Sequence, residues 1–125
     1  MEIKTAVSSL GALAQETRLS IFRLLVEAGR DGLAAGRIGE TLDVPRATLS
    51  FHLKELTRAG LVTARQERQF IYYAVDFDRM ADLMAFLTQN CCHGMPQACL
   101  NVVETALENC CPTSPSKPKK KRNRS

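Results

Sequence analysis

Residues 48–62 read TLSFHLKELTRAGLV, and this stretch says most about the fold. Leu49, Leu53 and Leu56 recur at the i, i+4 and i+7 spacing that lines one side of an α-helix. Pro45 suits the first turn of this helix, because an amide N–H there would have no intrahelical partner, and Gly60 suits its end. The pattern predicts an amphipathic helix with a leucine stripe toward a core and a polar, basic and aromatic outer face.

The elements on both sides of this helix predict the fold class. Apolar periodicity favours further helices, and two short β-branched and aromatic runs separated by four polar residues favour a hairpin. The predicted helices span residues 3–14, 16–28, 34–42, 45–60, 78–90 and, more weakly, 96–108, and the predicted strands span 61–65 and 70–75. This order, mainly α with a β-hairpin wing, is typical of a winged helix-turn-helix. In that fold one helix enters the DNA major groove and the hairpin reaches neighbouring phosphates or grooves.

The outer face of the 45–60 helix and the hairpin predict contacts with DNA. An arginine can pair with guanine, a hydroxyl with several base edges, and an apolar group with the thymine methyl. Basic residues farther along the helix and in the hairpin suit phosphates. The predicted DNA-binding residues are Arg46, Ala47, Thr48, Ser50, Phe51, His52, Lys54, Arg58, Arg65 and Arg68.

Single members of this set also have structural interpretations. Phe51 can pack against the next helix, and a solvated helix face explains Lys54 and Arg58 nearly as well. A lone histidine such as His52 is more often a packing residue than a ligand. The whole set, arranged on one fold, favours DNA binding over these separate explanations.

Two stretches carry a resemblance to a known family. Residues 12–25, ALAQETRLSIFRLL, resemble the opening of the ArsR/SmtB metalloregulatory repressors, and residues 48–62 resemble their recognition helix and wing entry. The family pattern S-x-H-L-x-x-L-x-x-A-G-L-V runs without a gap from Ser50 to Val62. The resemblance covers roughly residues 7–90. It implies a homodimer joined through its first and fifth helices, and a repressor that an inducer releases from its operator. In that pattern His52 is a structural or DNA-proximal residue.

The cysteines follow the predicted DNA-binding body; they are Cys91, Cys92, Cys99, Cys110 and Cys111. The chain turns through Gly94 and Pro96, so Cys99 can fold back over the adjacent pair. Three converging thiolates form a soft site, and trivalent arsenic and antimony prefer three sulfurs in a pyramid. Zinc prefers a closed tetrahedron, which His93 would complete.

The resemblance narrows the choice of inducer. The best-known arsenic repressors of the family carry Cys-x-Cys in the helix before the recognition helix, where residues 37–40 here read RIGE. Family zinc sites on the fifth helix pair Asp with His, whereas residues 78–90 hold Asp78 and Asp82 but no His. Other arsenic-responsive relatives use an adjacent Cys pair after the fifth helix and a third Cys a few residues on. The resemblance therefore implies that the inducer is trivalent arsenic and that it binds to Cys91, Cys92 and Cys99. Antimonite or a trivalent organoarsenical could take the same site.

Other interpretations of the cysteines stay open. Zinc or cadmium could be the inducer, oxidation of the same thiols could switch the repressor, or the cysteines could be packing residues of a regulator without inducer. A thiol enzyme is disfavoured, because the sequence has no Cys-x-x-Cys and no cysteine beside a Gly-rich turn. Cys110 and Cys111 could form a second soft site, relay the ion or do neither.

The composition fits one small domain with a tail. Hydrophobic residues make up 45% of the 125 residues. No apolar run approaches the ~20 residues of a membrane span, and the first residues lack the pattern of a signal peptide. We therefore expect a cytoplasmic protein with reduced thiols. Six of the 17 basic residues lie in the last nine positions, which leaves eleven against 13 acidic ones in the rest. The expected domains are a DNA-binding and dimerisation domain over 1–92, an inducer-binding extension over 91–111 and a disordered basic tail over 112–125. The tail either adds salt-dependent, non-specific DNA affinity or only aids solubility.

Overall fold

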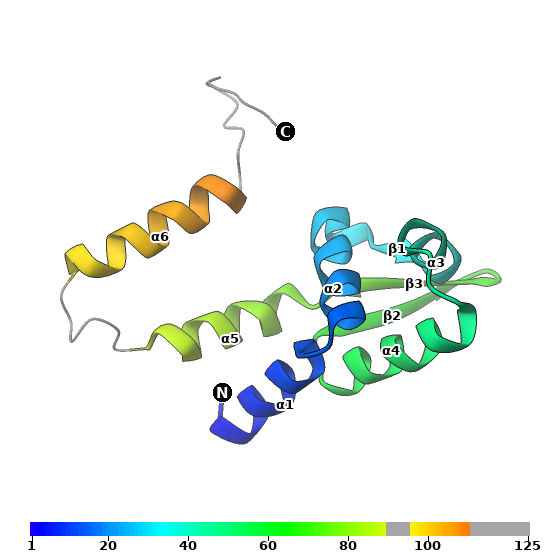
Figure 1. Ribbon diagram of the computed structural model, residues 1–125, viewed down its shortest axis with the longest axis horizontal. Helices are drawn as coiled ribbons and strands as arrows, with labels where there is room; N and C mark the ends of the chain where they lie inside the picture. The colour runs from blue at the N-terminus through cyan, green and yellow to red at the C-terminus, as the bar shows by residue number, and fades with distance from the viewer. Residues whose placement is uncertain (90–95, 111–125) are drawn as a thin grey trace. The chain divides into compact units, whose positions relative to one another are not determined.

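The computed structural model describes residues 1–89 and 96–110, in two units that divide between Leu87 and Thr88. The first unit folds from helices and a small sheet, and a helix represents the second (Figure 1). The elements are α1 (Ile3–Leu13), α2 (Glu16–Ala28), the 3₁₀ turn η1 (Gly29–Asp31), β1 (Leu33–Ala34), α3 (Ala35–Leu42), α4 (Arg46–Arg58), β2 (Val62–Glu67), β3 (Phe70–Val75), α5 (Phe77–Thr88) and α6 (Pro96–Cys110). The predicted winged helix-turn-helix, mainly α with a hairpin wing, is confirmed.

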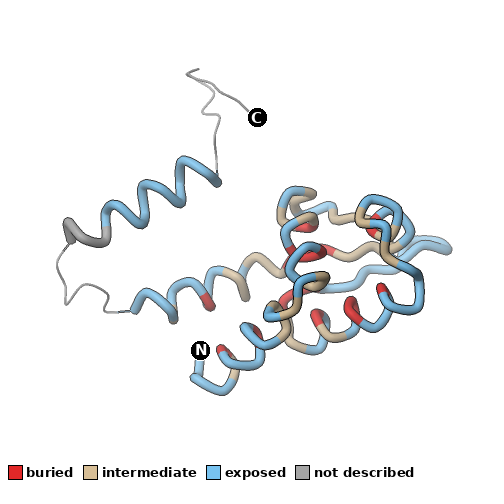
Figure 2. The backbone as a smooth tube through the Cα atoms, in the orientation of Figure 1, coloured by how far each residue is buried: buried red, intermediate tan, exposed pale blue. Residues whose placement is uncertain are grey.

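The core of the first unit confirms the leucine stripe of α4. Leu49, Leu53 and Leu56 are 4%, 2% and 0% exposed, and Figure 2 shows the buried positions of the backbone in red. The three leucines belong to one cluster with apolar residues of α2, α3 and the sheet. The other buried members of this cluster are Ile21, Phe22, Leu25, Ile38, Leu61, Val62 and Val75. Burial of a Leu or Ile side chain stabilises the folded state by about 1.5–3 kcal/mol. The cluster therefore anchors the buried side of α4 and fixes the direction in which its outer face points.

The sheet has a third strand that the sequence pattern did not predict. Strand order is β1-β3-β2 and both pairings are antiparallel, with Leu33 opposite Tyr73 and Val62 opposite Val75. β1 is only two residues long, too short to show any alternation of apolar and polar residues. It lies between η1 and α3 and pairs with β3, so the wing is attached to the body through the inner of its two strands.

The hairpin turn is also shorter than predicted. Four polar residues were expected in the turn, but Gln66 and Glu67 continue β2, and Glu67 lies opposite Phe70. The chain therefore reverses through Arg68 and Gln69 alone. Arg68 has φ +60°, the left-handed conformation that two-residue hairpin turns require. The polar composition of residues 66–69 marks the exposed end of the wing rather than the turn itself.

Helix boundaries differ from the predictions by one or two residues. α1 ends at Leu13 rather than Ala14, and α5 begins at Phe77 and ends at Thr88 rather than spanning 78–90. Pro45 is the N-cap of α4, one position before the first turn, and Ala34 belongs to β1 rather than to α3. The predicted helix over 96–108 exists and continues to Cys110.

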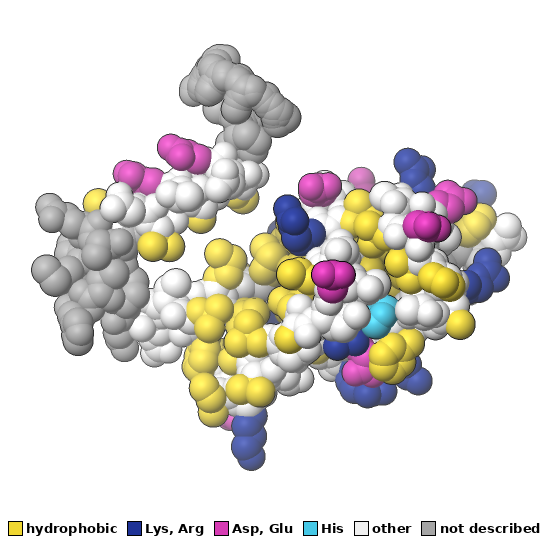
Figure 3. All heavy atoms as spheres, in the orientation of Figure 1, with side chains coloured by type: hydrophobic (Ala, Val, Ile, Leu, Met, Phe, Trp, Pro, Cys, Tyr) yellow, Lys and Arg dark blue, Asp and Glu magenta, His cyan; other side chains and the backbone are white. Residues whose placement is uncertain are grey.

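α1 and α5 expose large apolar side chains. In α1 the buried residues are Ala6 and Ser9, while Ile3 and Val7 are 65% and 61% exposed. In α5 Leu83 is buried, but the neighbouring turns expose Met84 and Leu87, as Figure 3 shows by the hydrophobic side chains gathered over the two helices. Apolar area of this kind on a small protein marks a surface that another molecule covers.

α6 is amphipathic and exposed along its described side chains. Leu100, Val103 and Leu107 recur at helical spacing and are 50%, 49% and 59% exposed. Among the described residues, the structure has no helix that is long and apolar enough to span a membrane.

Candidate nucleic-acid interface

The outer face of α4 is open to solvent along its length. The predicted contact residues on this helix other than His52 are exposed: Arg46, Ala47, Thr48, Ser50, Phe51, Lys54 and Arg58. Phe51 is 55% exposed, and its ring meets the ring of His52 edge to face with 5.5 Å between centroids. Of the two interpretations of Phe51, the structure therefore supports the outward-facing one over packing against the next helix. The buried leucines and this open face together give α4 the form of a recognition helix.

Charges on this surface fall into paired and unpaired groups. Arg58 forms an ion pair with Glu55 of the same helix at 3.1 Å, and Arg65 forms one with Glu67 of the same strand at 2.8 Å. These are the ion pairs found among residues 1–89 and 96–110. Arg46, Lys54 and Arg68 lie outside both pairs, so these three present undiminished positive charge to a phosphate or a base.

The two wing arginines have different surroundings. Arg65 donates to the carboxylate of Glu67, donates to the backbone carbonyl of Asp31 at 3.2 Å, and lies over the ring of Tyr72 at 5.2 Å. Arg68 lies at the turn and is exposed. Arg65 thus ties the wing to η1. A contact of either arginine with the DNA backbone stays a prediction.

His52 differs from the rest of its helix because it is buried. It is 7% exposed, and Arg18 Nη1 donates to its Nδ1 at 3.3 Å. Since a guanidinium has no acceptor, Nδ1 must be the unprotonated ring nitrogen. Burial lowers the pKa of His52 below the ordinary histidine value of 6.5, and the nearby charge of Arg18 lowers it further. Of the two roles implied by the family pattern, structural or DNA-proximal, this burial supports the structural one.

Arg18 is a residue that the sequence analysis did not single out. It lies within the stretch 12–25 on which the family resemblance rests, but its partner His52 is 34 positions away. The pairing has no periodicity and no local motif, so only the folded structure reveals it.

The predicted inducer site falls mostly outside the described residues. Cys91, Cys92 and His93 lie there, as does Cys111. Cys99 belongs to α6, and Cys110 ends that helix and is exposed. Within the described part of the chain, no group of three or more metal-ligating side chains comes together. The thiolate cluster of Cys91, Cys92 and Cys99 stays a prediction.

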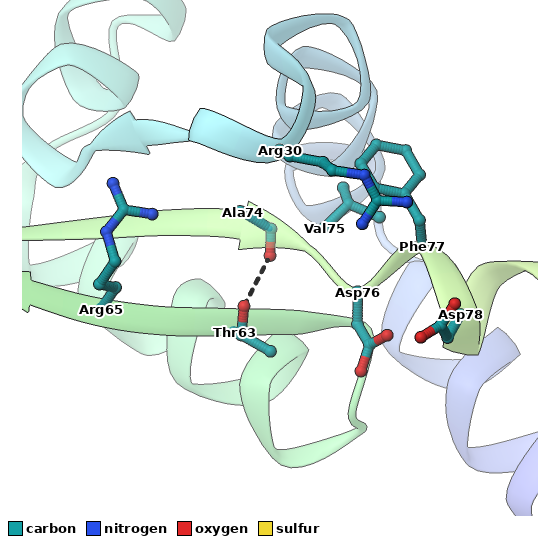
Figure 4. A pocket seen from close by; sticks show the side chains of 8 residues that line it. All are labelled: Arg30, Thr63, Arg65, Ala74, Val75, Asp76, Phe77 and Asp78. Atoms are coloured by element: carbon teal, nitrogen blue, oxygen red, sulfur yellow. Dashed lines mark hydrogen bonds between the residues drawn. The ribbon is translucent and has the colours of Figure 1, made fainter.

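A shallow pocket of about 330 Å³ lies at the base of the wing. Figure 4 shows Arg30 against the ring of Phe77, the carboxylates of Asp76 and Asp78 below them, and the Thr63 hydroxyl hydrogen-bonded to the carbonyl of Ala74 in the middle. Two arginines and two aspartates line the pocket. Because their charges balance, the lining does not select a class of ligand.

Comparison with known proteins agrees with this geometry. A family model described as a helix-turn-helix domain matches residues 13–65. The fold, the open face of α4 and this match define a winged helix-turn-helix transcriptional regulator that binds DNA. The transcriptional activator HlyU of Vibrio cholerae is 32% identical over 87 residues, which cover 70% of this chain and 78% of HlyU. The chain belongs to the ArsR family of winged-helix transcriptional regulators.

Solved structures and a further relative support the same assignment. The structure of HlyU from Vibrio cholerae matches with a TM-score of 0.55 and 34% identity, covering 70% of this chain and 97% of that chain. A homodimeric winged helix-turn-helix DNA-binding domain from Mycobacterium bovis matches with a TM-score of 0.59 and 27% identity, covering 86% of this chain and 85% of that one. A Halobacterium salinarum protein, provisionally assigned as the arsenical resistance operon repressor ArsR, is 39% identical over 71 residues, or 57% of this chain and 54% of that protein.

Proposed function

We propose that this protein is a cytoplasmic, homodimeric repressor that trivalent arsenic releases from its operator. The observation that carries the DNA-binding half is the open face of α4, with Arg46 and Lys54 exposed outside the ion pairs and three buried leucines behind them. The observation that carries the inducer half is that every cysteine lies beyond residue 90, after the DNA-binding body. The arsenical assignment of the Halobacterium salinarum relative supports arsenic as the inducer.

The dimer forms through α1 and α5 in this proposal. Ile3 and Val7 on α1 and Leu87 on α5 expose apolar surface that a second copy would cover. The homodimeric state of the Mycobacterium bovis relative supports the same assembly. A dimer sets its two recognition helices about one DNA turn apart, roughly 34–36 Å, which lets both enter the major groove of a two-fold operator.

The inducer binds in the extension that follows α5. Thiolates of Cys91, Cys92 and Cys99 supply three sulfurs, and clamping them together repositions the end of α5 and with it the two recognition helices. A coupling of about 3 kcal/mol between the sites weakens operator binding roughly 100-fold. Thiols must lose protons to bind, so induction weakens as the pH falls. In this scheme residues 1–92 bind DNA and dimerise, residues 91–111 sense, and the basic tail over 112–125 adds non-specific DNA affinity.

Operator binding followed by fluorescence anisotropy under reductant tests the inducer. Arsenite and antimonite are expected to weaken the affinity of the wild-type protein about 100-fold, and Cys91→Ser and Cys99→Ser are expected to abolish that response while binding DNA normally. Cys110→Ser serves as the matched control, since it removes one thiol outside the proposed set.

The other outcomes of the same titration separate the alternatives. Release by zinc or cadmium but not by arsenite would reassign the site to a metal ion and bring His93 into it. Release by an oxidant and recovery with reductant, without any metalloid, would identify a redox switch. A Cys99→Ser protein that still responds fully to arsenite would refute the proposed three-sulfur site.

A charge on the apolar face of α1 tests the dimer. Val7→Glu is expected to make the protein monomeric at micromolar concentration, because a carboxylate would be buried without a partner in the dimer interface. Operator affinity should fall about 100-fold or more, since the two half-sites are then bound separately. Sedimentation velocity measures the first effect and anisotropy the second.

Lys4→Glu is the control for this change, because Lys4 is exposed on the same helix but lies off the apolar stripe. A Val7→Glu protein that remains a dimer would show that α1 is not part of the interface.

A further inference from the structure

One guanidinium group joins three helices of the first unit. Arg18 belongs to α2, and its backbone N–H is held by the side chain of Gln15 at 2.8 Å. Its Nε donates to the carbonyl of Ala12 in the last turn of α1 at 2.6 Å, and its Nη1 donates to Nδ1 of His52 in α4 at 3.3 Å. The Arg18–His52 link, as we name these two side chains with the Ala12 carbonyl, therefore runs from α1 to the recognition helix.

We propose that Arg18 and His52 are positioning residues, which set the orientation of α4 relative to α1 and thereby the match between the two recognition helices and the operator. This inference rests on the proposed dimer through α1. Neither residue reads DNA in it: His52 is buried and faces Arg18, while the exposed residues around it make the contacts. The link fixes the orientation of α4 relative to α1 because its hydrogen bonds are directional and the guanidinium group that donates them is rigid.

The side chains between α1 and α4 leave an open space beside the Arg18–His52 link. An open cavity of about 210 Å³ lies beside Arg18, lined by Ser8 and Gly11 of α1, by Glu55 of α4 and by Ala59, which follows α4. Close-packed side chains fix the angle between two helices, and the packing beside an open gap is less complete. The hydrogen bonds through Arg18 thus supplement side-chain packing in holding α1 and the middle of α4 together.

The link is sensitive to the protonation of His52. A protonated Nδ1 cannot accept from Arg18, and the imidazolium and guanidinium would repel each other. The charged groups around this junction are few: Arg18 faces His52 from α2, Glu55 and Arg58 pair with each other on α4 at 3.1 Å, and α1 contributes uncharged residues to the cavity. Because the pKa of His52 is lowered, the link is intact at neutral pH and opens as the pH falls through that pKa.

Variants at both ends of the link test the proposal. Arg18→Gln is expected to weaken specific operator binding about tenfold to 100-fold while changing binding to a scrambled duplex by less than about twofold, because hydrogen bonds to a charged group are lost but no phosphate contact is. His52→Gln keeps an acceptor for Arg18 and should bind as the wild type does near pH 8. His52→Leu removes the acceptor and should bind the operator weakly at every pH. Arg23→Gln is the matched control, an exposed arginine of the same helix.

The pH profile provides the readout that a merely structural role would not change. Wild-type specific affinity, measured by anisotropy without inducer from pH 8 to pH 5, should fall toward acid pH, and His52→Gln should lack that fall. Sedimentation velocity and thermal melts at each pH establish that all variants remain folded dimers.

Each remaining outcome counts against the inference in a recognisable way. Equal losses for operator and scrambled duplex, or an acid fall that persists in His52→Gln, would overturn the positioning role while leaving the proposed dimeric regulator intact. A wild-type protein that is monomeric would overturn the proposed dimer and this inference together.

Discussion

Arg46→Ala is expected to weaken binding to the operator about 5- to 150-fold and to relax the base preference at one position of each half-site. Arg46 is the first residue of α4, it is exposed, and it takes part in neither of the ion pairs of the described residues. The N-terminal turn of a recognition helix is where side chains reach base edges, and an arginine there pairs with two acceptors of guanine. Anisotropy against the operator and a set of single-base variants measures both effects.

Lys54→Ala is the comparison that distinguishes a base contact of Arg46 from a phosphate contact. Lys54 lies two turns farther along the same face and suits a phosphate, so its loss should weaken all sequences evenly and reduce the slope of log affinity against log salt by about 1. Arg23→Ala on α2 controls for the loss of a surface charge. If Arg46→Ala also weakened all sequences evenly, Arg46 would be a phosphate contact and the base readout would have to come from elsewhere on α4.

Gly32→Ala is expected to lower the free energy of unfolding by about 2–5 kcal/mol, a large share of the roughly 5–15 kcal/mol of a small domain. Gly32 has φ +73°, and a Cβ at this position would collide with the backbone carbonyl oxygen of Tyr73 on β3. The neighbouring residue Leu33 pairs with Tyr73, so the collision cannot be relieved without separating β1 from the sheet. Urea denaturation followed by circular dichroism measures the change in stability.

Gly36→Ala is the matched control for this substitution. Gly36 is helical, exposed, and has nothing within 4 Å of an added Cβ. Alanine there should be neutral or raise stability by up to about 1 kcal/mol, because it reduces the conformational freedom of the unfolded chain. Equal effects of the two substitutions would mean that the close approach of Gly32 to β3 has no energetic importance.

The elements that could be predicted from the sequence are those with a repeating pattern. The leucines of α4 repeat at helical spacing, and all three are buried. β1 cannot be predicted from a pattern, because two residues contain no repeat. The predicted turn is two residues longer than the turn in the structure, because exposed strand ends are as polar as turns. Patterns report which side of an element is buried, but they do not report which strand a short segment pairs with.

The candidate site was predictable to a similar degree. The outer face of α4 follows from the angle of each residue around the helix, so the exposure of Arg46 and Lys54 could be expected. The burial of His52 agrees with its interpretation as a packing residue, but its hydrogen bond with Arg18 could not be predicted, because the chain brings Arg18 close only by folding α2 against α4. Arg65 was predicted to reach phosphates from its charge and place in the hairpin, although its contacts with Glu67 and Asp31 are visible only in three dimensions.

Those contacts of Arg65 have a consequence for the free-energy cost of association. A hairpin that becomes ordered only on DNA loses about 1–2 kcal/mol of backbone conformational entropy for each residue that is immobilised. Here Asp31 and Glu67 hold Arg65, and Tyr72 lies under it, so much of that ordering has already happened during folding. The wing is therefore a preorganised arm before any duplex is bound, so a DNA contact made through it would carry little further cost of ordering Arg65.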